Sequence, residues 1–329
     1  GLEAKVRLFR RKYGLARRLW LGSRKLNLTR AIDVQHGKDW WRHLWQHLQH
    51  FDLVLEEDLD QCDDDEYFTR FAAFVSGVLA QRRVRDIRKF HLFCSYSDKT
   101  SFHERSLNNW LLAAIGPQLQ DLDLSLYMNS CISMYSCYTV PRGIFSCRSL
   151  ASLTLDGLLR LENLPSVDLP ALKTLTLSIK GTVPMDMIFS GCPVLEDLFL
   201  EFNVRNAPKI IVSNSLKRLS VSCGSITLFD EVEVEIDAPA LEYLSFKCYV
   251  SLSRFTIKNL HNVVEAHIDF CPSSVQGDKD NRVVYIHRLL NALCRAKLLF
   301  LDSITMEVGY SILTNILVDL QLLIVGSFL

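Results

Sequence analysis

Apolar residues recur along the chain in a six-residue pattern, L-x-x-L-x-L, with other apolar side chains replacing leucine at some positions. Most copies start 21 to 25 residues apart, and three gaps are longer, at 31 to 33 residues. This spacing is typical of leucine-rich repeats, and the longer gaps leave room for an additional helix or loop. The copies are IRKFHL (87–92), LQDLDL (119–124), LASLTL (150–155), LKTLTL (172–177), LEDLFL (195–200), LKRLSV (216–221), LEYLSF (241–246) and VVEAHI (263–268), with weaker copies AKLLFL (296–301) and LVDLQL (317–322).

The second half of each copy has the alternation of a β-strand, in which neighbouring side chains point to opposite faces. One such unit cannot bury its leucines alone, whereas stacked units bury them in a continuous core. We therefore predict an α/β fold: a leucine-rich-repeat solenoid with a curved parallel sheet and with short helices and loops on its convex side. A small helical N-terminal segment is expected to precede the repeats.

The segments between the hexads contain helix and turn signals. Residues 101–116 predict an amphipathic helix that buries Leu107, Trp110, Leu111 and Ala114 and stops at Gly116. Residues 183–191 predict a shorter helix with Val183, Met187 and Ile188 inward and an end at Gly191. A proline stands two residues before the first leucine in the copies that start at residues 172, 195 and 241, which suits a loop that leads into a strand.

If the leucines face the core, the residues between them line the concave face of the sheet. Serine and threonine on this face pack well across neighbouring strands without any ligand. Phe199 and Tyr243 are less easily explained, since exposed aromatic side chains among polar ones are typical of interfaces. We predict a recognition patch of Phe199, Arg218 and Tyr243 within a partner-binding face that includes Asp121, Asp123, Asp197, Phe199, Glu201, Arg218, Tyr243 and Lys247. The complete predicted face is Lys89, His91, Phe93, Asp121, Asp123, Ser125, Ser152, Thr154, Asp156, Thr174, Thr176, Ser178, Asp197, Phe199, Glu201, Arg218, Ser220, Ser222, Tyr243, Ser245, Lys247, Glu265, His267 and Asp269.

Composition narrows the classes of function. Lys plus Arg and Asp plus Glu both number 37, so the chain has no excess of positive charge to attract nucleic acid. Charge is nonetheless uneven: residues 1–38 are basic, which also permits an organelle transit peptide, and residues 52–66 are acidic. No apolar run is long enough to span a membrane. The ten cysteines form no CxxC pair, and several end apolar runs, as in FHLFC (90–94) and LSVSC (219–223). We expect an intracellular protein of the nucleus or cytoplasm.

Three features were considered as chemical sites. His43, His47 and His50 would align on one face of a helix, but Leu44 stands where a zinc-protease helix needs Glu, so they are interpreted as a solvated face. The acids at 56–66 lack the spacing of a calcium loop and are interpreted as a solvated loop before a helix at 66–80. No phosphate-binding loop or nucleophile motif is found. We expect no catalytic residues, no metal and no cofactor.

Several stretches resemble the plant F-box/leucine-rich-repeat proteins of the FBD-associated kind, in content and in order. They are WWRHLWQHLQHFDL (40–53), EEDLDQCDDDEYFTRFAAFVSGVL (56–79), IRKFHL (87–92), NNWLLAAIGPQLQDLDLSL (108–126), SCRSLASLTLDG (146–157), DLPALKTLTL through GCPVLEDLFLE (168–201) and IDAPALEYLSF (236–246). The resemblance covers about residues 40–305. It implies a non-catalytic, substrate-recognition subunit of a cullin-type ubiquitin ligase, whose F-box docks a Skp-type adaptor while the repeats bind the protein substrate.

The resemblance also indicates which residues would meet the adaptor. The last F-box helix is carried by Trp41, Arg42, Leu44 and Trp45, whereas the Leu-Pro opening of an F-box is absent from residues 1–39 and no FBD segment is recognisable at the end. We therefore expect a divergent basic segment at 1–39, an F-box remnant with an acidic loop and helix at 40–80, and the repeats at 81–329. The alternatives are a free-standing interaction scaffold and a truncated or pseudogene product.

Overall fold

A computed structural model of the chain describes most of the repeat region and parts of the N-terminal region. The chain forms two compact units, residues 1–164 and residues 165–329. The described residues are 25–29, 49–56, 64–80, 82, 86–96, 104–128, 137–161, 164, 166–179, 181–203, 210–224, 233–248, 254–270, 288–293, 295–301 and 323–326.

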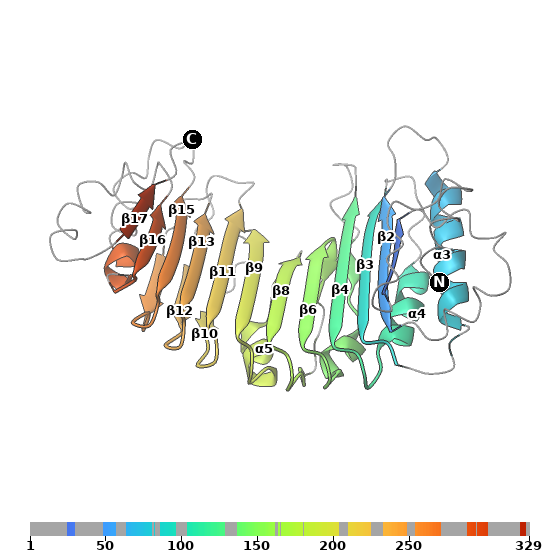
Figure 1. Cartoon of the computed structure of the whole chain (residues 1–329), viewed down its shortest axis with the longest axis horizontal. Coiled ribbons are helices and arrows are strands. Elements are labelled where there is room, and N and C mark those ends of the chain that lie inside the picture. Colours follow the sequence, from blue (N-terminus) through green and yellow to red (C-terminus); the bar gives the residue numbers. More distant parts are fainter. Residues whose placement is uncertain are drawn as a thin grey trace, which may run out of the picture. The chain divides into compact units, whose positions relative to one another are not determined.

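The first unit is built on a parallel sheet whose strands lie in the order β1-β2-β3-β4-β6 (Figure 1). A short parallel pair, β5 and β7, stands apart from this sheet. The elements are β1 (Lys25–Thr29), β2 (His50–Glu56), α3 (Asp64–Ala80), β3 (Lys89–Tyr96), α4 (Glu104–Ala114), β4 (Asp121–Met128), β5 (Tyr138–Thr139), the 3-10 helix η2 (Arg142–Ser146), β6 (Ser152–Gly157) and β7 (Leu159–Arg160).

The second unit continues the same architecture with strands in the order β8-β9-β11-β13-β15-β16-β17. A second parallel sheet has the order β10-β12-β14. The elements are β8 (Thr174–Ile179), α5 (Met185–Gly191), β9 (Asp197–Asn203), β10 (Ile210–Val212), β11 (Arg218–Gly224), β12 (Glu233–Asp237), β13 (Tyr243–Cys248), β14 (Arg254–Lys258), β15 (Glu265–Phe270), β16 (Leu298–Leu301) and β17 (Leu323–Gly326).

Leucine alternation produces the core in both units. In β6 and β8 every second residue is buried, and Leu153, Leu155, Leu175 and Leu177 are at most 2% exposed. The same holds for the fourth and sixth positions of the hexads in β3, β4, β9, β11, β13, β15 and β16. The predicted leucine-rich-repeat solenoid is therefore confirmed, with parallel pairing in every described register.

The helices agree closely with the sequence. In α4 the buried residues are the four that were predicted, and Trp110 packs edge-on against Phe71 of α3. The helix predicted at 66–80 is α3, which begins at Asp64. In α5 the predicted inward side chains are partly wrong: Met185 and Ile188 are buried, whereas Met187 is half-buried. The helix begins only after Pro184, so the positions three apart that face the core are 185 and 188.

The segments between the hexads, predicted as short helices and loops, also contain the strands β5, β7, β10, β12 and β14, because their backbones pair with each other in the same parallel way. Two further strands lie N-terminal to the first hexad, where no strand was predicted. His50–Glu56 forms β2 and pairs with β3, so the interpretation of His50 as part of a helix with His43 and His47 is wrong. His43 and His47 lie outside the described residues. Lys25–Thr29 forms β1 and pairs with β2, which places sheet structure on the N-terminal side of residue 81. At the other end, β17 at Leu323–Gly326 pairs with β16, downstream of the hexad predicted at 317–322, and those residues lie outside the described ones.

Candidate functional site

The two faces of the main sheets differ sharply in the second unit. We call the side that points away from the leucine core the open face. In β8, β9, β11, β13, β15 and β16 it consists of the alternate residues Thr174, Thr176, Ser178, Asp197, Phe199, Glu201, Arg218, Ser220, Ser222, Tyr243, Ser245, Lys247, Glu265, His267, Asp269, Leu298 and Phe300, none of which is buried. The predicted outward orientation is thus confirmed for the residues from Thr174 to Asp269, whereas Leu298 and Phe300 were not among the predicted ones.

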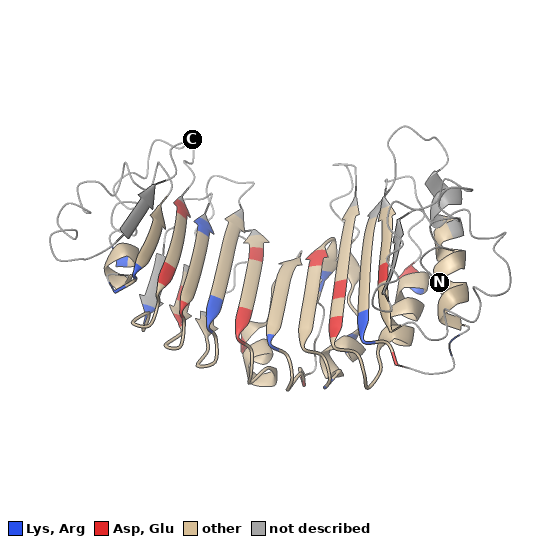
Figure 2. Ribbon diagram, in the orientation of Figure 1, with Lys and Arg blue, Asp and Glu red and all other residues tan. Residues whose placement is uncertain are grey.

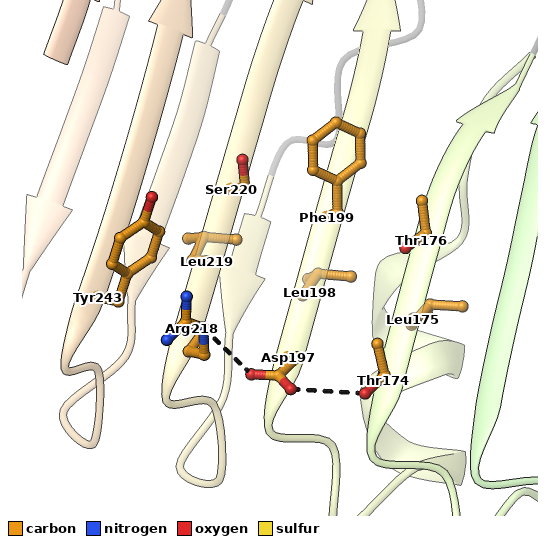
Figure 3. A pocket seen from close by; sticks show the side chains of 10 residues that line it. All are labelled: Thr174, Leu175, Thr176, Asp197, Leu198, Phe199, Arg218, Leu219, Ser220 and Tyr243. Atoms are coloured by element: carbon orange, nitrogen blue, oxygen red, sulfur yellow. Dashed lines mark hydrogen bonds and ion pairs between the residues drawn. The ribbon is translucent and has the colours of Figure 1, made fainter. Parts of the chain in front are cut away.

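A shallow pocket of about 260 Å³ opens on this face across strands β8 to β13. Figure 3 shows Phe199 and Tyr243 on β9 and β13, with β11 and the small side chain of Ser220 between them. Phe199 is 36% exposed, which is unusual for a phenylalanine on a polar surface. The ten lining residues are Thr174, Leu175, Thr176, Asp197, Leu198, Phe199, Arg218, Leu219, Ser220 and Tyr243.

Arg218 is held at one edge of the pocket by two weak interactions. Its guanidinium carbon lies 4.5 Å from the centre of the Tyr243 ring, a cation–π contact, and its Nε lies 3.8 Å from Oδ1 of Asp197. Thr174 donates a 3.5 Å hydrogen bond to the other oxygen of Asp197 (Figure 3). The Arg218 side chain is 61% exposed, so the Asp197 pair contributes little to folding and the guanidinium remains accessible.

Aromatic rings continue along the open face beyond the pocket. The rings of Tyr243 and His267 lie 5.5 Å apart, and His267 stacks on Phe300 with 4.2 Å between ring centres and 8° between ring planes. Glu265 lies 2.6 Å from Nε2 of His267, so it fixes the edge of the imidazole ring. The result is a row of rings across β13, β15 and β16 on one face.

The open face of the first unit is more acidic. On β3 and β4, Lys89 donates a 2.7 Å hydrogen bond to Oδ2 of Asp121, and Nε2 of His91 lies 3.2 Å from the same oxygen. Asp123 accepts a hydrogen bond from Ser125 at 3.0 Å. Tyr127 donates to Asp156 on β6 and packs beside Phe93 at 5.6 Å.

These contacts shift the pKa values of the first unit's groups in opposite directions. Burial alone would raise the pKa of Asp121, but its interactions with His91 and Lys89 outweigh burial and lower the pKa to about 2. The pKa of His91 is raised, chiefly by its contact with Asp121 and against the effect of burial. The pKa of Asp123 is raised by burial, because its hydrogen bond from Ser125 only partly compensates.

A pH dependence of stability follows from the Asp121–His91 pair. Asp121, with its lowered pKa, adds stability above its unfolded value of 3.8 that is lost as the pH falls toward 2, and His91 adds stability below 6.5 that is lost as the pH rises through its raised pKa. Asp121→Asn should therefore cost about 1–2 kcal/mol between about pH 4 and pH 6.5 and less at pH 8, where Lys89 remains the cationic partner. Denaturant unfolding of both proteins at several pH values measures this, and a difference that is constant from pH 4 to pH 8 would rule out the assigned role of His91.

The sequence-predicted site residues fall into three groups. Asp197, Phe199, Arg218 and Tyr243 line one pocket, and Glu201 and Lys247 lie in the adjoining row of the same open face. Asp121 and Asp123 lie on the open face of the first unit. The residues expected to meet the adaptor, which are Trp41, Arg42, Leu44 and Trp45, lie outside the described residues.

Phe300 was missed by the sequence analysis. The hexad AKLLFL (296–301) was recognised, and its fifth position, residue 300, faces outward by the same alternation as the other copies. The stacking of Phe300 on His267 required the register of β15 against β16. Within the described part of the chain, no three or more His, Cys, Asp and Glu side chains are grouped as they would be around a metal ion. The helices that can be described there are all too short or too polar to cross a membrane.

Parallel strands repeat along the chain and bury their leucine side chains on one face of the sheet. This arrangement defines the chain as a leucine-rich-repeat protein. Residues 107–262 match the family model of the leucine-rich repeats of the FBD-associated F-box protein At5g56370. The chain is 29% identical to the FBD-associated F-box protein At1g66310 of Arabidopsis thaliana over 82% of its own length and 59% of that protein, and 30% identical to the putative F-box/FBD/LRR-repeat protein At1g66290 over 82% and 58%. The predicted resemblance to the plant F-box/leucine-rich-repeat proteins of the FBD-associated kind is therefore confirmed.

The match covers only part of the length of each relative. The chain spans about six tenths of the length of the relatives named above. It is 29% identical to the F-box/LRR-repeat protein At4g14103 of Arabidopsis thaliana over 82% of the chain and 71% of that protein. No solved structure matches the chain.

Proposed function

We propose that this protein is the non-catalytic, substrate-recognition subunit of a cullin-type ubiquitin ligase, and that it binds its protein substrate on the open face of its repeats. The observation that carries the proposal is the pocket beside Phe199, an accessible aromatic site on a face made mostly of polar side chains. The relatives' names, F-box and LRR-repeat protein, support the same class. The proposal places the protein in the nucleus or cytoplasm and the adaptor contact at Trp41, Arg42, Leu44 and Trp45.

Affinity capture of the tagged full chain from plant cells tests both halves of this proposal. The wild type should recover a Skp-type adaptor together with a substrate protein. The double variant Trp41→Ala, Trp45→Ala should lose the adaptor and keep the substrate. The triple variant Phe199→Ala, Arg218→Ala, Tyr243→Ala should lose the substrate at least about tenfold and keep the adaptor, since the removed side chains are the aromatic and arginine residues that dominate interfaces.

A matched control is Val212→Ala on β10, which removes an exposed apolar side chain outside the open face. It should recover the same proteins as the wild type. Failure of the wild type to recover any adaptor would refute the ligase role, and an unchanged set of proteins with the triple variant would refute the recognition surface.

One observation favours a second candidate, a protein-binding scaffold with no route to ubiquitin. Lys25–Thr29 is a strand that pairs with β2, in the part of the chain where the family resemblance would place the helices of an F-box. A scaffold of this kind would recover the same substrate through the open face and no adaptor under any condition.

A further inference from the structure

The pocket of the second unit lies over a small side chain between two rings. We call its part over Ser220, between Phe199 of β9 and Tyr243 of β13, the trough (Figure 3). Ser220 is the direct partner of Phe199 in the neighbouring strand, so no large side chain of β11 stands between the two rings in that row. Beyond Tyr243 the rings of His267, at 5.5 Å, and of Phe300, which stacks on His267, continue the aromatic surface.

The width of this trough matches one flat side chain. Neighbouring strands lie about 4.8 Å apart, so two strand steps separate β9, which carries Phe199, from β13, which carries Tyr243, by roughly 10 Å. A ring inserted midway would lie about 5 Å across the strands from each, within the range in which aromatic rings attract each other.

The charges that frame the trough have a net sign. Asp197, Glu201, Glu265 and Asp269 stand in the rows above and below the row of Ser220, against Arg218 and Lys247, which leaves four acids and two bases on the open face of β8, β9, β11, β13, β15 and β16 (Figure 2). The two bases already have acidic neighbours, with Arg218 at 3.8 Å from Asp197 and Lys247 at 3.2 Å from Asp269. Glu201 is exposed, and its side chain accepts only a serine hydrogen bond among the contacts described, from Ser178 at 3.2 Å.

We propose that the trough over Ser220 takes an aromatic side chain of an extended protein segment, and that basic residues next to this aromatic residue meet the acids that frame it. The inference rests on the proposed function and specifies the substrate class for the same face. The aromatic residue is the anchor, because it removes Phe199 and Tyr243 from water, and the basic residues set specificity through charge complementarity.

Short synthetic peptides with a central Trp, Phe, Leu or Ala, flanked by either Lys or Glu, test the proposal against the immobilised full chain. The Trp and Phe peptides with Lys flanks should bind at least about tenfold more tightly than the Ala peptides and than the same aromatic peptides with Glu flanks. The preference for Lys over Glu should weaken as the salt concentration rises.

Variants test whether the peptides bind in the trough. Ser220→Trp should fill the trough and abolish aromatic selectivity, and Phe199→Ala should weaken the aromatic peptides about tenfold. Glu201→Gln should leave aromatic selectivity intact and reduce the preference for Lys flanks. Val212→Ala, at an exposed position of β10 outside the open face, is the matched control and should change neither, and circular dichroism confirms that each variant is folded.

Three results would overturn the inference: equal binding of aromatic and Ala peptides, equal binding of Lys-flanked and Glu-flanked peptides, or a dimer in light scattering whose formation Phe199→Ala abolishes. The proposed function would survive the first two if capture from cells still depends on Phe199, Arg218 and Tyr243. The proposed function would fail if the triple variant captured the same substrate protein as the wild type. The peptide result could still stand in that case.

Discussion

Replacing Leu219 by Asn should unfold the second unit, whereas the same replacement at the next residue, Ser220, should leave it folded. Leu219, the second residue of β11, is 0% exposed and lies between Leu198 and Leu244 of the neighbouring strands. Loss of a buried leucine costs about 3–5 kcal/mol, and an unpaired buried amide adds about 1–3 kcal/mol. The sum, at least about 4 kcal/mol, is comparable with the whole stability of a typical domain.

The comparison between Leu219→Asn and Ser220→Asn isolates the direction of the side chain. Both changes introduce the same amide into the same strand, so helix or strand propensity cannot separate them. Denaturant unfolding followed by circular dichroism measures the two free energies of unfolding, with an expected cost below about 1 kcal/mol for Ser220→Asn because its side chain stays in water. Equal costs at the two positions would contradict the alternation on which the repeat fold depends.

Truncation of Trp110 to Ala should destabilise the first unit by about 3–5 kcal/mol. The Trp110 side chain is 1% exposed, donates a 2.9 Å hydrogen bond from Nε1 to the Ser76 hydroxyl, and meets the Phe71 ring edge-on at 5.9 Å. Trp110 of α4 thus contacts α3 through both a hydrogen bond and an aromatic ring. Thermal or denaturant unfolding measures this cost as the change in the free energy of unfolding in the transition of the first unit.

The control for Trp110 lies in the same helix. Leu112 is 55% exposed, and Leu112→Ala should cost less than about 0.5 kcal/mol because no buried surface is lost. Trp110→Phe keeps most of the apolar contact and loses the hydrogen bond, so an intermediate cost of about 1–2 kcal/mol is expected. If Trp110→Ala cost no more than Leu112→Ala, the packing of α4 on α3 would be incorrect.

Sequence periodicity predicted most of the fold because one physical requirement, burial of alternate leucines, is repeated many times. The prediction failed where the same residues fit both the period of a strand and the period of a helix. The segment LQHFDL (48–53) fits the hexad as well as its neighbours do, but Leu48 also extends the helical stripe of Trp41, Leu44 and Trp45. Tertiary pairing of β2 with β3 decided the outcome for His50 onward, and short apolar runs cannot be separated by period alone.

The candidate site was only partly predictable for a different reason. Alternation indicates which side chains face outward, so Phe199, Arg218 and Tyr243 could be selected from the sequence. Their contacts depend on register between strands that are 20 or more residues apart in the chain. The pairing of Arg218 with Tyr243 in one row, and of Ser220 with Ser245 in the next, is a property of the stacked repeats that no single repeat contains.

The central claim is that the open face binds a substrate protein. Site-specific photo-crosslinking tests this claim most directly. A photoreactive residue replaces Ser222 on the open face of β11 in the full chain, and in a parallel sample it replaces Val212 on β10. In plant cells, illumination should join the chain covalently to a substrate protein from position 222 and give no such product from position 212. A product from position 212 with none from position 222 would show that the protein is held elsewhere.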